Sequence, residues 1–70
     1  MNPEFRTLSP REREVMFQIS TGKTNRSIGD TLFISERTVK FHCANIFKKL
    51  NVKNRTTLIS RYLDDIKQLH

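Results

Sequence analysis

The sequence predicts an all-α fold, a compact domain of four helices that contains a helix-turn-helix. Apolar residues recur at the three- and four-residue spacing of amphipathic helices in four successive segments. The connections between these segments are only three or four residues long, which favours helices packed in one cluster. Each segment also follows a residue type that caps helices well, and these four residues are Ser9, Thr24, Ser35 and Asn54.

The folded domain is expected over 8–70, behind a flexible arm over 1–7 that shows no periodicity. Part of the arm is also consistent with vector-derived residues, because Glu4-Phe5 is the pair that a common cloning site encodes. The first helix is predicted over 10–21, where Ser9 and Glu12 form a capping box. Glu12 also lies on the apolar side, so a basic partner such as Arg55 is the alternative account of it.

Three further helices are predicted over 25–32, 36–50 and 55–68. A turn at Phe33-Ile34 separates the short second helix from the longer third one. A short helix, a tight turn and a longer helix are typical of a helix-turn-helix, whose longer helix enters the major groove of DNA. Gly29 is expected to weaken the second helix by about 0.5–1 kcal/mol.

The positive charge is concentrated in the middle of the chain. Residues 22–55 hold eight basic and two acidic side chains, and this net charge of +6 equals that of the whole chain. A basic patch of this kind is typical of a protein that binds a polyanion. A solvated basic face that serves solubility is the alternative.

The third helix has two faces of different chemistry. At about 100° per residue, Val39, Cys43, Ile46 and Leu50 share one side and predict a buried stripe. Lysine and arginine donate to guanine, asparagine pairs with adenine, and apolar groups meet the thymine methyl. We therefore expect five residues on or beside the opposite face to contact DNA bases: Arg37, Lys40, Phe41, Ala44 and Asn45. Two alternatives are Phe41 packed under the second helix and Asn45 on a phosphate.

Phosphate contacts are expected from two other places. Lys48 and Lys49 follow on the third helix, with plain solvation as their alternative. The start of the second helix offers backbone N–H groups, a helix dipole and a positive charge through Thr24, Asn25 and Arg26.

The fourth helix is expected to pair two domains. Its apolar residues spread over an arc of about 140°, of which Ile59 and Leu63 can cover the core. The remaining apolar residues would form a strip in water: Leu58, Tyr62, Ile66 and Leu69. A two-fold pairing would bury this strip and set two recognition helices one DNA turn, roughly 34 Å, apart. In the alternative, Tyr62 folds back onto the core and the domain is a monomer.

No catalytic residue, metal site or cofactor is expected. The two histidines and the single cysteine lack the spacing of metal ligands. Neither a Gly-rich phosphate loop nor a catalytic triad pattern is present. We also find no signal peptide and no apolar run near the roughly 18 residues of a membrane span, so we expect a cytoplasmic protein without membrane contact.

Three stretches of the chain resemble the LuxR-type (FixJ/NarL-type) DNA-binding domain of bacterial transcriptional regulators. They are LSPREREV from Leu8, GKTNRSIGDTLFIS from Gly22 and ERTVKFHCANIFKKLNVKNRT from Glu36. The resemblance extends over about residues 8–63 and implies a homodimer on inverted-repeat half-sites of double-stranded DNA, with RNA polymerase as a further partner. It also implies that the chain is the C-terminal effector domain of a longer regulator, such as a response regulator, with a stand-alone member as the alternative.

The resemblance also assigns roles to individual residues. It implies that Lys40 and Phe41 approach base edges, and that Thr38, Asn25 and Arg26 approach the backbone. Ser35, at the head of the third helix, is also expected to contact the DNA backbone. The sequence departs from the family at Ala44, where a polar residue is common, and at Phe41 and Tyr62, which are larger than usual.

Two other functions fit parts of the pattern. The promoter-binding region of a sigma factor has a similar opening and helix-turn-helix, but it does not normally carry the Asn-Arg-Thr helix after Asn54. A basic protein-interaction module would use the same charge to meet an acidic protein. Such a module would not bind duplex DNA in a salt-sensitive way.

Overall fold

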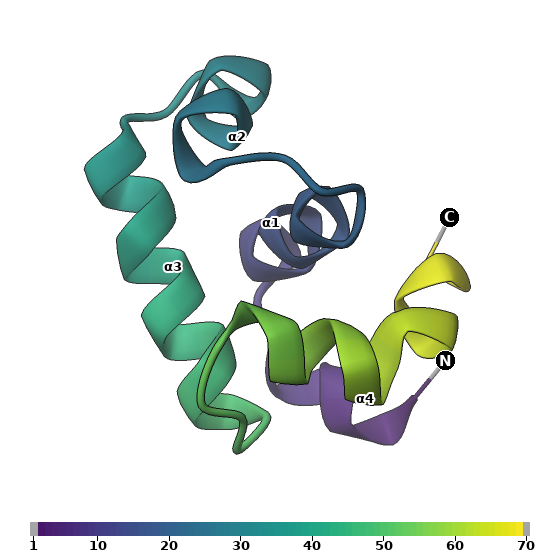
Figure 1. The fold of residues 1–70 in the computed structure, drawn as a ribbon. Coiled ribbons are helices and arrows are strands. Elements are labelled where there is room, and N and C mark those ends of the chain that lie inside the picture. Colours follow the sequence, from purple (N-terminus) through teal and green to yellow (C-terminus); the bar gives the residue numbers. More distant parts are fainter. Residues whose placement is uncertain (1, 70) are drawn as a thin grey trace.

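Four α-helices follow a short 3-10 helix in the computed structural model, which describes residues 2–69 (Figure 1). The 3-10 helix η1 spans Pro3–Thr7, and the α-helices are α1 Pro10–Ser20, α2 Asn25–Leu32, α3 Glu36–Lys49 and α4 Arg55–Lys67. Every α-helix begins and ends within one residue of its predicted bounds, and the predicted all-α class is confirmed. Met1 and His70, at the predicted domain boundaries, lie outside the described residues.

Each α-helix begins where its predicted cap satisfies the backbone. The side chains of the four caps accept a hydrogen bond from the backbone N–H three residues further along the chain. At the head of α1 the bond is reciprocal: Glu12 N–H donates to Ser9 Oγ at 3.0 Å, and Ser9 N–H donates to Glu12 Oε1 at 2.8 Å. The predicted capping box is therefore confirmed.

The core gathers around α1, which contacts α2, α3 and α4 (Figure 1). Its Val15, Met16 and Ile19 are fully buried. The remaining members come from the other helices and from the segments between them: Phe5, Leu8, Ile28, Val39, Cys43, Ile46, Leu50, Val52, Leu58, Tyr62 and Ile66. One continuous apolar cluster thus fixes the orientation of α3 relative to the rest of the domain.

The turn between α2 and α3 depends on the absence of a side chain at Gly29. Ile34 N–H donates to Gly29 O at 3.0 Å, which brings the turn back onto α2. A Cβ at position 29 would lie 2.6 Å from Ile34 O, closer than real Cβ contacts. Phe33, between them, takes the left-handed conformation with φ 59°. The glycine that is expected to weaken the helix is thus the residue that lets the helix-turn-helix close.

The segment expected as a flexible arm contains η1, which contacts α4. Phe5 of η1 is fully buried, and its ring centroid lies 5.7 Å from that of Tyr62. The Tyr62 hydroxyl donates to the Glu4 carboxylate, and Asn2 Nδ2 donates to Asp65 Oδ2 at 3.1 Å. One buried aromatic residue anchors the segment, and one residue leaves no periodicity in the sequence.

The prediction that α4 carries an apolar strip on its surface is wrong. Leu58 and Ile66 are fully buried, Tyr62 is 6% exposed, and Leu69 packs against the core while partly buried. Ile59, expected in the core, is only partly buried. The reason is that this side of α4 faces α1 and the core, and that Phe5 of η1 packs on Tyr62 (Figure 1). The predicted dimer contact through these four side chains therefore loses its basis.

Candidate nucleic-acid interface

The two faces of α3 separate as predicted. Val39 and Ile46 are fully buried, and nearly so are Cys43 and Leu50, the residue directly after α3. The outer face carries exposed basic and apolar side chains: Arg37, Lys40, Phe41, Ala44 and Lys48. Asn45, beside this face, is partly buried. Because α3 lies along one edge of the domain, its outer face is turned away from α1 and α4 (Figure 1).

Phe41 is the apolar residue at the middle of this face. Its side chain is 63% exposed, so the alternative in which it packs under α2 is wrong. It contacts the His42 ring edge to face, with ring centroids 5.9 Å apart. An exposed aromatic ring among basic side chains can meet the methyl group of a thymine without rearranging the domain.

Lys40 pairs with an acid of its own helix. Its Nζ lies 3.6 Å from Glu36 Oε2, one helical turn away, and both side chains are about half exposed, at 64% and 48%. Exposed pairs of this kind contribute at most about 1 kcal/mol. Lys40 can therefore exchange its acid partner for an anion or a base edge at small cost.

The hydroxyl groups at the head of α3 already have partners. Thr38 N–H donates to Ser35 Oγ at 3.0 Å, and the two hydroxyl oxygens lie 2.9 Å apart. Ser35 is exposed, whereas Thr38 is partly buried. Their role as a helix cap is established by these contacts. The predicted contact with the DNA backbone stays a prediction.

The start of α2 brings together the capping residue Thr24, the basic side chain of Arg26 and the hydrogen-bonded side chain of Asn25. Thr24 Oγ1 accepts from Ser27 N–H at 3.1 Å, and Arg26 is exposed. Asn25 is partly buried, and its Oδ1 accepts from Arg55 Nη2 and from Cys43 Sγ, the latter at 3.8 Å. Burial raises the pKa of the Cys43 thiol, while Arg55 works in the opposite direction. The thiol therefore remains protonated and available as a donor to Asn25.

Lys48 and Lys49 differ although they are neighbours. Lys48 is exposed, whereas Lys49 Nζ lies 2.7 Å from Glu12 Oε1. Burial raises the pKa of the Glu12 carboxyl, but the bonds from Lys49 and Ser9 outweigh it and hold the pKa below its ordinary value of 4.5. Lys49, not Arg55, is thus the basic partner of Glu12. A phosphate would have to compete with that carboxylate for Lys49.

Sequence reasoning missed these long-range pairs. Glu12 on an apolar face signalled the need for a base, but Lys49 lies 37 residues away and several lysines and arginines could serve. The Arg55 contact with Asn25 spans 30 residues and had no signal of its own. Only the packing of the helices determines which of many basic residues reaches which acceptor.

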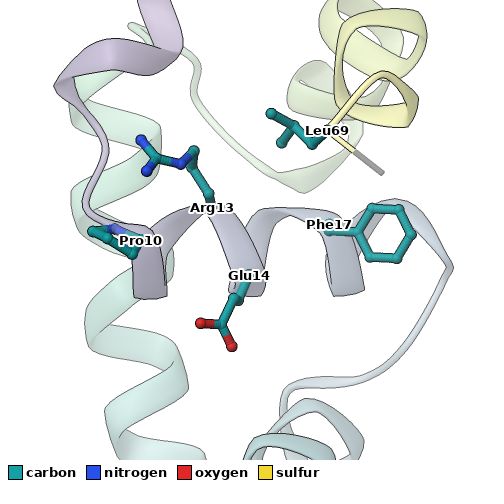
Figure 2. A pocket seen from close by; sticks show the side chains of 5 residues that line it. All are labelled: Pro10, Arg13, Glu14, Phe17 and Leu69. Carbon is teal, nitrogen blue, oxygen red and sulfur yellow. The ribbon is translucent and has the colours of Figure 1, made fainter. Parts of the chain in front are cut away.

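A second surface feature lies away from the outer face of α3. A shallow hollow lies between α1 and the residues after α4, lined by Pro10, Arg13, Glu14, Phe17 and Leu69 (Figure 2). It contains none of the residues predicted to contact DNA bases or phosphates. Over residues 2–69 we find no group of three metal-ligating side chains and no helix long and apolar enough to cross a membrane.

A short helix that packs on a longer one across a tight turn, with exposed basic residues along the longer helix, defines a helix-turn-helix DNA-binding domain. Comparison with known sequences specifies the family. Residues 6–62 match the family described as "Bacterial regulatory proteins, luxR family", and the chain belongs to it. The resemblance stated from the sequence is thereby confirmed. This family is a class of DNA-binding regulators and not a class of enzymes.

Curated relatives carry the same domain within longer chains. The chain is 43% identical over 65 residues to the "Probable csgAB operon transcriptional regulatory protein" of Salmonella typhimurium, covering 93% of this chain and 30% of that protein. It is 50% identical over 50 residues to "Transcriptional regulatory protein LiaR" of Bacillus subtilis, covering 71% and 24% respectively. A "Nitrate/nitrite response regulator protein homolog" of Haemophilus influenzae is 51% identical over 49 residues, which cover 70% of this chain and 24% of that protein. The chain thus spans less than a third of the length of these relatives.

Proposed function

We propose that this domain binds double-stranded DNA in a sequence-specific way, with α3 in the major groove. The observation that carries the proposal is the outer face of α3. It is exposed and basic, it contains an exposed aromatic residue, and after Glu36 the helix has no acidic side chain. Such a face matches the acceptors and thymine methyl groups that the major groove displays.

The proposed contacts are exposed side chains together with the partly buried Asn25, Thr38 and Asn45. Bases are read by side chains on or beside the outer face: Arg37, Lys40, Phe41, Ala44 and Asn45. Phosphates are bound by side chains at the two helix starts and at the end of α3: Thr24, Asn25, Arg26, Ser35, Thr38 and Lys48. Lys49 contributes only as far as it releases Glu12, because the two groups already form an ion pair.

Two domains are proposed to bind an inverted repeat as a homodimer. The contact would use the outward side of α4, because the inward side is covered by the core and by η1. Thr56 and Ser60 are exposed on α4, and Leu63 is partly buried. A Leu63→Asp substitution should abolish cooperative occupancy of paired half-sites and leave binding to single half-sites intact. Undiminished cooperativity would show that the dimer contact lies elsewhere.

The wider setting is proposed from the relatives. Their names describe transcriptional regulatory proteins and, in one case, a response regulator. The domain would therefore act as the C-terminal effector domain of a bacterial transcriptional regulator in the cytoplasm, with RNA polymerase as a further contact. The sigma-factor alternative loses support because the family that matches is a different one.

The test is titration of the domain with duplex DNA at several salt concentrations. If about four phosphates are neutralised, log K falls against log salt with a slope of roughly −3 to −4. Lys40→Ala should reduce affinity for the preferred site by about 1–3 kcal/mol and relax the preference at one or two base pairs. Lys48→Ala should weaken all sequences alike and reduce the slope by about one.

Two results would contradict the proposal. A binding isotherm that stays flat between low and physiological salt would remove the electrostatic basis, and the basic protein-interaction module would then be favoured. Equal behaviour of the two lysine variants on specific and random duplexes would show that the division into base and phosphate contacts is wrong.

A further inference from the structure

Arg55 joins several parts of the domain beside the proposed interface. It is the first residue of α4, and its side chain is partly buried. Its Nη1 donates to the backbone carbonyl of Lys23, in the loop before α2, and its Nη2 donates to Oδ1 of Asn25, the first residue of α2. Cys43 Sγ, from α3, lies 3.8 Å from the same oxygen. One guanidinium thus ties α4 to the start of the short helix.

These contacts decide which way the Asn25 carboxamide points. A guanidinium can only donate hydrogen bonds, and the protonated thiol of Cys43 also donates here. The carboxamide must therefore turn its oxygen toward them and its NH2 group away from them. Within residues 2–69, Nδ2 of Asn25 has no hydrogen-bond partner. This leaves a donor at the start of α2.

The same guanidinium restrains the backbone next to that donor. The Lys23 carbonyl directly precedes Thr24, which caps α2 and accepts from Ser27 and Ile28. A planar guanidinium that bonds two acceptors at once fixes their relative positions more firmly than a single point donor does. The first turn of α2 is therefore held in place both by its own cap and by α4.

We propose that Arg55 is a positioning residue for phosphate binding. It orients the Asn25 carboxamide and the first turn of α2, so that the NH2 group of Asn25 and the backbone N–H groups of that turn meet one DNA phosphate as preformed donors. Donors that are already oriented lose less conformational entropy when the anion binds. Arg55 itself has both ends of its guanidinium engaged and acts through Asn25. The inference rests on the proposed function, because it requires DNA as the ligand.

The decisive variant is Arg55→Lys, which keeps the charge but lacks the planar fork that holds two acceptors in a fixed geometry. Affinity for specific and for random duplexes should both fall about tenfold, the size of one hydrogen bond to a charged group. The slope of log K against log salt should stay the same, because the charge is kept and the lost donor is a neutral amide. The side-chain amide resonances of Asn25 should also shift in the nitrogen-15 spectrum of the free domain. Arg61→Lys, at an exposed position of the same helix, is the matched control and should change none of these readouts.

A second variant answers the case in which Arg55→Lys does not fold. Asn25→Asp preserves an acceptor for Arg55 and should melt no lower than the wild type, but it replaces the proposed donor with a carboxylate. We expect it to lose more than tenfold in affinity. Thr31→Asp, which adds the same charge at an exposed position near the other end of α2, should lose less. Wild-type affinity in folded Arg55→Lys or in Asn25→Asp overturns the inference. Failure of the wild-type domain to bind duplex DNA instead overturns the proposed function, and the inference with it.

Discussion

Helices α3 and α4 are both amphipathic, yet the sequence predicts the buried side of α3 correctly and that of α4 wrongly. In α3 the two sides differ in chemistry, because the apolar stripe lies opposite basic residues. In α4 apolar residues spread over a wide arc, and the side that is buried depends on what covers it. That cover comes from α1 and from η1, whose Phe5 packs on Tyr62. The spacing of apolar residues thus predicts the buried side of a helix only where charged residues on the opposite side mark that side as exposed.

The largest effect should come from placing a charge on the buried side of either helix. Ile46→Asp in α3 and Ile66→Asp in α4 should each unfold the domain, because both positions are fully buried and would hold an unpaired carboxylate. Circular dichroism and thermal melting measure this loss. Leu63→Asp, at a partly buried position of α4, is the control and should keep a cooperative melt. If the Ile66→Asp variant folds, position 66 is exposed in solution, as the sequence predicts.

The second prediction concerns the cover over α4. Phe5→Ala should reduce the free energy of unfolding by about 3–5 kcal/mol, the usual cost of removing a buried phenylalanine side chain. Phe5 is fully buried against Tyr62, whereas its neighbour Arg6 is exposed and Arg6→Ala should have little effect. Urea denaturation of both variants makes the comparison. If Phe5→Ala is as stable as Arg6→Ala, η1 does not cover the helix in solution.

The cases of Phe5 and of the helix caps show where sequence reasoning succeeds and where it stops. The bounds of all four α-helices follow from local signals, since a cap such as Ser9 bonds a backbone group only three residues away. The outer face of α3 follows from periodicity for the same local reason. The basic partners of Glu12 and Asn25 lie 30 or more residues away, and the only buried side chain of η1 is that of Phe5. Such contacts are set by the relative placement of helices, which no local pattern encodes.

The third prediction tests how α3 is held to α1. Glu12→Gln should reduce the free energy of unfolding by about 1–3 kcal/mol at neutral pH, because it weakens the bonds to Lys49 and Ser9. The folded protein holds the Glu12 pKa below 4.5, so this stabilisation is fully present above that pH. It is lost as the pH falls through the lowered pKa, where the carboxyl group takes up a proton.

Urea denaturation at neutral pH and at a pH of about 3 measures this dependence. The difference between the wild type and Glu12→Gln should shrink at the lower pH. Glu14→Gln is the control on the same helix, because Glu14 is exposed and its carboxylate lies 3.4 Å from the exposed Arg11 guanidinium. A difference that is the same at both pH values would show that the Glu12 charge does not join α1 to α3.

The smallest effect on stability should come from the aromatic residue on the outer side of α3. Phe41 is 63% exposed, so Phe41→Ala should change the free energy of unfolding by no more than about 0.5 kcal/mol, whereas Tyr62→Ala on the inner side of α4 should be far more destabilising. The consequence for DNA is more specific. If Phe41 meets a thymine methyl group, the wild type should prefer thymine to uracil at one position of its best site by about fourfold, which corresponds to about 0.8 kcal/mol for one buried methyl group. The variant should bind both duplexes equally. The best site comes from selection among random duplexes, and single thymine-to-uracil replacements then locate the position. A thymine preference that survives in Phe41→Ala would assign the methyl contact to another residue of this face, with Ala44 as the remaining apolar candidate.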